Sequence, residues 1–115
     1  KAEGQDVKTL TGVAASKGTV TGKARVLHNA GQLHKIKPGE ILVCEATSPN
    51  WTPAFSKIAA CVCDGGGTLT HASIISREYR IPCVVGVGLA TSAINTGDEI
   101  EVDGTKGVVT VFKNQ

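Results

Sequence analysis

The sequence has few aromatic side chains and no dense run of one charge. Trp and Tyr occur once each and Phe twice, and 12 basic side chains nearly balance 10 acidic ones, for a formal net charge of +2. A protein that binds a nucleic-acid backbone usually carries a basic patch, and single-strand binders add aromatic side chains on which bases stack. We therefore expect no nucleic-acid partner.

Long apolar runs are also missing. The longest ones, at residues 58–62 and 84–87, are far shorter than the about 20 apolar residues that a membrane-spanning helix needs. No signal-peptide pattern is visible. We expect no membrane partner and a cytoplasmic location. The chain begins at Lys1 rather than Met, which suggests a processed chain or a piece of a longer one.

The four cysteines lack the C-x-x-C spacing of zinc and redox sites. Each lies in an apolar run typical of a buried strand, where Cys behaves as a small hydrophobic side chain: Cys44, Cys61, Cys63 and Cys83. We predict buried free thiols and no metal site, in keeping with a reducing compartment. A cysteine-based metal module is a weaker alternative, which an analysis showing no bound zinc would remove.

The length of 115 residues is enough for one domain with a single core, since domains commonly have roughly 100–150 residues. We expect residues 1–10 to be a linker or tail and residues 11–113 to form the domain. Apolar runs at residues 41–44, 59–63 and 83–85 predict buried strands. The Asp103-Gly104 pair between alternating apolar residues predicts a C-terminal hairpin.

Two short helices are expected between these strands. Ser48 could cap the first, with Pro49 at its first position, and Trp51 and Phe55 would pack it on the core at i and i+4. The second runs from about residue 70 to 79, because Pro82 prevents a longer one. Its core-facing residues are expected to be Ala72, Ile74 and Ile75. The whole is an α/β domain with more strand than helix.

The segment from Asp64 to Ser73 has the composition of a phosphoryl-transfer site. It predicts a strand end, a glycine turn and a helix with His71 in its first turn. Glycines let the backbone approach an anion, and a helix N-terminus offers free N–H donors to phosphate oxygens. A histidine of ordinary pKa, about 6.5, is a competent neutral nucleophile at physiological pH. The residues expected to support the phosphoryl group are Gly66, Gly67, Thr68, Thr70 and Ser73.

The same segment lacks the parts of a complete kinase. It has no Lys-Ser/Thr pair after the glycines, as a P-loop has, and Asp64 is its one acidic side chain. Nucleotide and metal would have to be presented by another domain, which predicts a carrier rather than a complete enzyme. A lone histidine beside glycines is more often structural, so these residues alone leave that interpretation open.

Residues 66–86, GGTLTHASIISREYRIPCVVG, closely resemble the signature of the phosphoenolpyruvate-utilising enzyme mobile domain. This swivelling phosphohistidine domain occurs in pyruvate phosphate dikinase, phosphoenolpyruvate synthase, rifampicin phosphotransferase and phenylphosphate synthase. Further similarity extends over about residues 11–112. The resemblance implies a swivelling β/β/α fold with mixed sheets and two or three short helices. It also implies that His71 is the phosphorylated residue and that the loop with Thr47 and Ser48 lies near it, where these two residues would help to support the phosphoryl group.

The resemblance also implies partners. The family's domain shuttles between an ATP-grasp nucleotide-binding domain or subunit and an acceptor-binding domain or subunit, so ATP and Mg²⁺ would reach this chain through a partner and no cofactor would be bound by the domain itself. Because the chain ends a few residues past its last expected strand, we expect a C-terminal or stand-alone carrier. The alternative is a non-catalytic docking module with the same fold, in which His71 is never phosphorylated.

Several positions depart from the family's usual pattern. Leu69 stands where dikinases commonly have Thr, which resembles the rifampicin phosphotransferase and phenylphosphate synthase branch and argues against threonine-based regulation. Ser73 replaces the usual Ala, and Arg80 replaces the usual Gly.

Arg77 and Glu78 match a family pair that we interpret as structural or as a docking contact. We expect the remaining histidines, at positions 28 and 34, to be ordinary polar residues.

Overall fold

The computed structural model describes residues 5–114 and contains one eight-stranded sheet in the order β1-β8-β7-β3-β4-β5-β6-β2. The strands are β1 (Gln5–Thr11), β2 (Val13–Ser16), β3 (Thr19–Val26), β4 (Ile41–Cys44), β5 (Ala60–Cys63), β6 (Cys83–Val85), β7 (Glu99–Asp103) and β8 (Val108–Asn114). The helices are the α-helices α1 (His71–Tyr79) and α2 (Ala90–Ala93) and the 3₁₀ helices η1 (Ala30–Lys35) and η2 (Pro49–Ser56).

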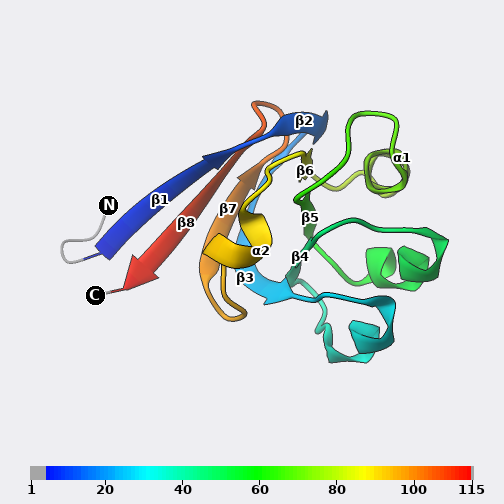
Figure 1. Ribbon diagram of the computed structural model, residues 1–115, viewed down its shortest axis with the longest axis horizontal. Helices are drawn as coiled ribbons and strands as arrows, with labels where there is room; N and C mark the ends of the chain where they lie inside the picture. Colours follow the sequence, from blue (N-terminus) through cyan, green and yellow to red (C-terminus); the bar gives the residue numbers. More distant parts are fainter. Residues whose placement is uncertain (1–4, 115) are drawn as a thin grey trace.

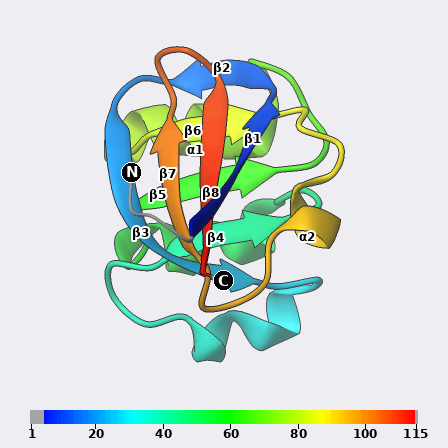
Figure 2. The ribbon, with the colours of Figure 1, turned by 90° about the vertical axis from the view of Figure 1, so that its left-hand side faces the viewer.

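The sheet is folded back on itself. Strands β1 and β2 form its two opposite edges, yet only Gly12 separates them in the sequence. A sheet whose edges are one residue apart has to curl until those edges meet. The long strand β3 makes the bend, because it pairs with β7 antiparallel through residues 19–23 and with β4 parallel through residues 24–26. Figure 2 shows the resulting antiparallel layer crossing in front of the parallel strands β4, β5 and β6.

The parallel strands are buried on both faces, which explains why they are continuously apolar rather than alternating. One core lies between the two layers of strands and includes Ile41, Val43, Val62, Val84, Ile100 and Val102. The other lies between the parallel strands and the helices and includes Leu42, Cys61, Phe55, Ile58, Ala72 and Val85. Figure 1 shows α1 on the far side of β4–β6 from β1, β7 and β8. The predicted β/β/α fold class is confirmed.

The N-terminal segment differs from its predicted structure. We expected residues 1–10 to be a linker or tail, but Gln5–Thr11 form β1, which pairs antiparallel with β8 over all seven of its residues; residues 1–4 lie outside the described residues. The strand cannot be predicted from the sequence, because Val7, Lys8 and Thr9 are exposed and form no apolar pattern. Its partner lies about a hundred residues away in the chain, so only tertiary pairing reveals it.

The two expected helices are present with altered details. Helix α1 ends at Tyr79 as predicted. Ala72 is buried and Ile75 packs against the core as predicted, but Ile74 is 44% exposed. The fully buried residues of the helix are Ala72, Ser73 and Ser76. These small side chains let α1 lie close to the sheet. The first helix, η2, is 3₁₀ and contains Pro53, and Ser48 caps it without a side-chain hydrogen bond. The prediction that Trp51 and Phe55 are core residues is confirmed.

The hairpin turn between β7 and β8 lies so close to β2 and β6 that it tolerates only glycine at position 104. A Cβ built on Gly104 would lie on the backbone oxygen of Ser16 and 2.9 Å from the backbone nitrogen of Cys83. Both neighbours are backbone atoms, so relief requires the turn to move away from the two strands. Gly65 offers the matched control, because its nearest neighbour would be the Glu45 oxygen at 3.6 Å, an ordinary contact.

Gly104→Ala is therefore expected to destabilise the domain by at least about 2 kcal/mol, the magnitude of an overpacked core site. Gly65→Ala should cost less than about 1 kcal/mol. Urea unfolding followed by circular dichroism measures both. Equal stability of Gly104→Ala and the unsubstituted chain would contradict the close approach of the turn.

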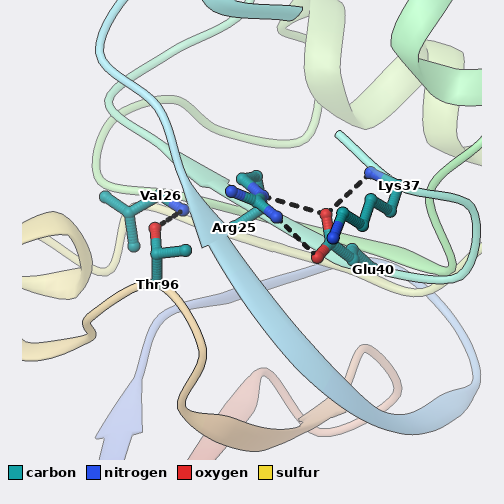
Figure 3. Close-up of polar contacts among 5 residues, drawn as sticks. All are labelled: Arg25, Val26, Lys37, Glu40 and Thr96. Carbon is teal, nitrogen blue, oxygen red and sulfur yellow. Dashed lines mark hydrogen bonds and ion pairs between the residues drawn. The ribbon is translucent and has the colours of Figure 1, made fainter. Parts of the chain in front are cut away.

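A bidentate ion pair joins β3 to the turn that precedes β4. Arg25 Nε and Nη2 each donate to one oxygen of the Glu40 carboxylate at 2.9 Å, and the Lys37 backbone N–H donates to Glu40 Oε1 at 2.8 Å (Figure 3). The pair is mostly shielded from water, with side chains 19% and 14% exposed. Hydrogen bonding from Arg25 outweighs burial and holds the pKa of Glu40 below its ordinary value of 4.5.

Glu40→Gln is expected to lower the free energy of unfolding at neutral pH by about 1 to 2 kcal/mol. Since the folded state lowers the pKa of Glu40, the stabilisation is complete above about pH 4.5 and is lost as the pH falls through the folded-state pKa. The difference between Glu40→Gln and the unsubstituted chain should thus shrink steadily as the pH is lowered below about 4.5. Urea unfolding at neutral pH and at a series of acidic pH values tests this, with the exposed Glu78→Gln as control. A difference that persists at low pH would rule out the ion pair as its cause.

Candidate functional site

His71 is the first residue of α1, and the loop before it begins at the carboxyl end of β5. Two backbone hydrogen bonds extend the β4–β5 pairing past the strands: Asp64 N–H donates to the Cys44 oxygen at 3.0 Å, and Gly65 N–H to the Glu45 oxygen at 2.9 Å. The loop after β5 therefore starts directly beside the loop after β4. That neighbouring loop carries Thr47 and Ser48, as the family resemblance implied.

Both ring nitrogens of His71 lie at threonine hydroxyls. Thr47 Oγ1 is 2.8 Å from Nδ1, and Thr52 Oγ1, from η2, is 3.3 Å from Nε2. The ring of Phe55 packs nearly perpendicular to the imidazole, with ring centroids 6.1 Å apart. The imidazole is half-buried. Three contacts from one neighbouring segment thus orient a histidine that still reaches the surface.

The glycine loop is held by the carbonyl of Gly67. This oxygen accepts hydrogen bonds from Thr70 Oγ1 at 2.8 Å and Ser73 Oγ at 2.6 Å, and from the Thr70 N–H at 3.2 Å. Gly66 has φ of +101°, and a Cβ there would lie 2.9 Å from Thr70 Oγ1, so this position requires glycine. A Cβ on Gly67, by contrast, would meet nothing within 4 Å. The loop is thus fixed on its inner side and open on its outer side.

The predicted phosphate-supporting residues differ in their availability. Ser48, Thr68 and Thr70 are exposed near His71. Ser73 is fully buried, and its hydroxyl is used by the Gly67 carbonyl, so its position is that of a loop support. Thr52 belongs to no sequence motif, so its contact with His71 could not be predicted. Phe55 was expected in the core, but its contact with the imidazole was not expected. Only the packing of η2 against α1 brings these two residues to the imidazole.

Two charged residues near the loop have structural contacts. Asp64 Oδ1 accepts from the N–H groups of Ala90 and Thr91 at 2.6 and 3.2 Å, and its Oδ2 accepts from Thr91 Oγ1 at 2.5 Å. Arg77 donates from Nη1 to the Ala15 oxygen and from Nη2 to the Thr68 oxygen, both at 2.8 Å. These contacts fit the structural alternative for Arg77. Asp64 holds the start of α2 in place.

The cysteines are core residues. All four are buried free thiols, as predicted. Contacts with neighbouring thiols, Cys44 first among them, together with burial, raise the pKa of the Cys61 thiol well above its ordinary value. Within residues 5–114 no three His, Cys, Asp or Glu side chains are grouped so as to hold a metal ion. Over the same residues, no helix is both long and apolar enough to span a membrane.

The fold and this histidine and glycine arrangement define the class of swivelling β/β/α domains. Residues 36–107 match the family described as PEP-utilising enzyme, mobile domain, and the chain belongs to that family. Domains of this family are parts of phosphotransferases and synthases. The resemblance inferred from residues 66–86 is confirmed.

Relatives with high identity are much longer proteins. Chondramide synthase of Chondromyces crocatus is 48% identical over 107 residues, covering 93% of this chain and 3% of that protein. Phosphoenolpyruvate synthase of Pyrococcus furiosus is 46% identical over 100 residues, 87% of this chain and 12% of the enzyme. Rifampicin phosphotransferase of Bacillus cereus is 41% identical over 112 residues, 97% of this chain and 13% of the enzyme. The chain therefore spans only a small part of these relatives.

Solved structures agree with the fold. A solution structure of Enzyme I superposes with a TM-score of 0.61 at 31% identity, covering 69% of this chain and 33% of that one. Aconitase X of Thermococcus kodakaraensis superposes with a TM-score of 0.67 over 90% of this chain and 98% of that one. At 19% identity, the second likeness concerns the fold alone.

The contact with Thr47 predicts the tautomer of His71. The hydrogen bond at Nδ1 fits either direction of donation, and we predict that the neutral ring carries its proton at Nδ1 and donates it to Thr47 Oγ1. Thr47→Val removes this acceptor and should shift the population toward the Nε2–H tautomer. Imidazole ¹⁵N chemical shifts, recorded at about pH 8 where an ordinary histidine is neutral, measure the change. Thr52→Val should leave Nδ1–H dominant, and a ring already protonated at Nε2 in the unsubstituted chain would refute the assignment.

Proposed function

We propose that this chain is a phosphoryl carrier, in which His71 accepts a phosphoryl group from a nucleotide held by another domain and passes it to an acceptor at a second site. The observation that carries the proposal is the arrangement of His71 itself. Its imidazole is oriented from both nitrogens by Thr47 and Thr52, at the N-terminus of α1 and behind an open glycine loop. Membership of the mobile-domain family supports the same role.

We infer that the chemistry takes place at Nε2. With Nδ1–H donating to Thr47, the lone pair lies on Nε2, where the 3.3 Å contact to Thr52 is the longer and more easily replaced one. Nε2 forms the new bond to phosphorus as the bond to the leaving-group oxygen breaks, and the electron pair of that bond stays on the leaving oxygen. The ring gains positive charge in this step, and the Nδ1–H bond to Thr47 stabilises it. Transfer to the acceptor reverses the same step.

The phosphoryl oxygens would be held by the open side of the loop. Helix α1 has no side-chain cap at its N-terminus, so its first N–H groups are available for an anion. Gly66, Gly67, Thr68 and Thr70 border that space. Thr70 donates its hydroxyl proton to the Gly67 carbonyl, whereas the exposed Thr68 is expected to offer its hydroxyl to the phosphoryl group.

The donor nucleotide and its Mg²⁺ would belong to a partner, an ATP-grasp domain or subunit, and the acceptor to a further domain or subunit. The one acidic side chain of the loop, Asp64, already accepts three hydrogen bonds from Ala90 and Thr91. The relatives are several times longer than this chain, which leaves room for such domains in them. The four free thiols favour a cytoplasmic setting.

The decisive variant is His71→Gln. Incubation with the cognate nucleotide-binding partner and phosphorus-labelled ATP should place acid-labile, base-stable label on the chain, and His71→Gln should lower labelling by at least about 10³-fold, since no other group replaces the nucleophile. His34→Gln, at an exposed histidine, is the matched control and should label normally.

The result also separates the carrier from a docking module with the same fold. A partner that hydrolyses or binds ATP normally but leaves the unsubstituted chain unlabelled would refute the carrier and support the docking module. Equal labelling of His71→Gln and the unsubstituted chain would refute the assignment of the nucleophile.

A further inference from the structure

A pocket lies at the opposite end of α1 from His71. It has a volume of about 660 Å³ and is formed by β2 with the turn after it, the end of α1 and the turn between β7 and β8. Three cationic side chains line it: Lys17, Arg77 and Arg80. The volume falls within the roughly 300–1,000 Å³ range of small-molecule sites. None of its lining residues is acidic.

The positive charge of the pocket is not neutralised by the protein. Lys17 and Arg80 are exposed, and among residues 5–114 their side chains make no ion pair or hydrogen bond. The guanidinium of Arg77 is held in place by the carbonyls of Ala15 and Thr68, which are neutral acceptors. Two of these cations, Arg77 and Arg80, come from the end of α1, and Lys17 comes from the turn after β2. Like charges gathered at one concavity repel one another, and an anion between them removes that repulsion.

Arg80 has a backbone conformation that an arginine adopts only at a cost. It follows the last residue of α1 with φ of 59° and ψ of 42°, and it is the only non-glycine residue with positive φ between residues 5 and 114. Glycine takes this position after a helix without strain. Attraction to the helix dipole accounts for a cation in the last turn, such as Arg77, but not for an arginine in the left-handed conformation. Strain of this kind is typically retained where the side chain is used.

We propose that this pocket binds a small organic phosphate, with the phosphate between Lys17 and Arg80 and the apolar part against Ala14 and Ala15. Planar guanidinium groups and a lysine ammonium match the charge and geometry of a phosphate monoester. Thr105 adds a hydroxyl donor, since its Oγ1 accepts from the Gly18 N–H and keeps its own proton free. The site is separate from His71 and does not depend on the phosphoryl-carrier function.

Titration of the chain with phenyl phosphate, followed by amide chemical shifts, tests the proposal. Saturable shifts at Ser16, Lys17, Gly104 and Thr105 are expected, with a Kd of about 1 mM or below. Inorganic phosphate should bind several-fold more weakly, because it lacks the apolar part. Binding should be unchanged in His71→Gln, so that failure here is distinguishable from failure of the carrier function.

Variants separate a built site from general attraction to a basic chain. Lys17→Gln and Arg80→Gln should each weaken phenyl phosphate binding about 10-fold, whereas Lys35→Gln, at an exposed lysine outside the pocket, should have no effect. Arg80→Gly is the sharpest variant. It should raise or preserve the melting temperature, because glycine relieves the strain, and still weaken binding about 10-fold.

Three outcomes would overturn the proposal. These are shifts confined to residues 66–73, affinities that fall equally in Lys35→Gln and Lys17→Gln, and no saturable binding up to about ten times the expected Kd. The absence of saturable binding could be accompanied by binding of an acidic partner domain. If Arg80→Gln abolished that binding, the pocket would be assigned to protein docking instead.

Discussion

Parallel pairing of β4 with β5 is the interaction on which the candidate site depends. The register aligns Cys44 with Cys63, and hydrogen bonds from Asp64 and Gly65 continue the pairing beyond both strands. Neighbouring parallel strands end at the same edge of a sheet, so their following loops are adjacent there. This places Thr47, shortly after β4, beside His71, which follows the loop after β5. The pairing in turn requires both faces of these strands to be covered, one by the antiparallel layer and the other by the helices.

The site combines a rigid support with an open surface. Gly67 is anchored through its carbonyl, Asp64 anchors the start of α2, and Arg77 anchors Thr68. The outer side of the loop is unobstructed, and Leu69, two residues before His71, is 84% exposed. A histidine that exchanges a group with other domains needs both properties: an orientation fixed in advance limits the entropy lost on reaction, and an accessible ring lets large partners approach. An enclosed pocket would satisfy only the first.

Helix α1 connects this site to the basic pocket. His71 begins the helix, and Arg80 follows its end in the left-handed conformation. Between them, Arg77 binds the carbonyl of Ala15 on the pocket side and that of Thr68 on the loop side. The short helix is packed through the small residues Ala72, Ser73 and Ser76, which bring it close to the sheet and leave its two ends at different surfaces. One element therefore positions two chemically distinct regions.

The sequence by itself determined the features that depend on local patterns. Continuous apolar runs indicated the buried strands, and the Asp103-Gly104 pair indicated the hairpin. Residues 64–73 and the family signature together indicated the histidine loop. These features can be predicted because turns and strands buried on both faces require particular residue types at neighbouring positions.

The tertiary structure decided what depends on residues far apart in the chain. Strand β1 exists because β8 pairs with it, Thr52 reaches His71 because η2 packs on α1, and Ser73 supports the loop because the close approach of α1 to the sheet buries it. The pocket likewise arises only when the turn at Gly104 meets β2 and the end of α1. These contacts give no periodic pattern in the sequence, because each one depends on the position of a residue in a distant segment of the chain.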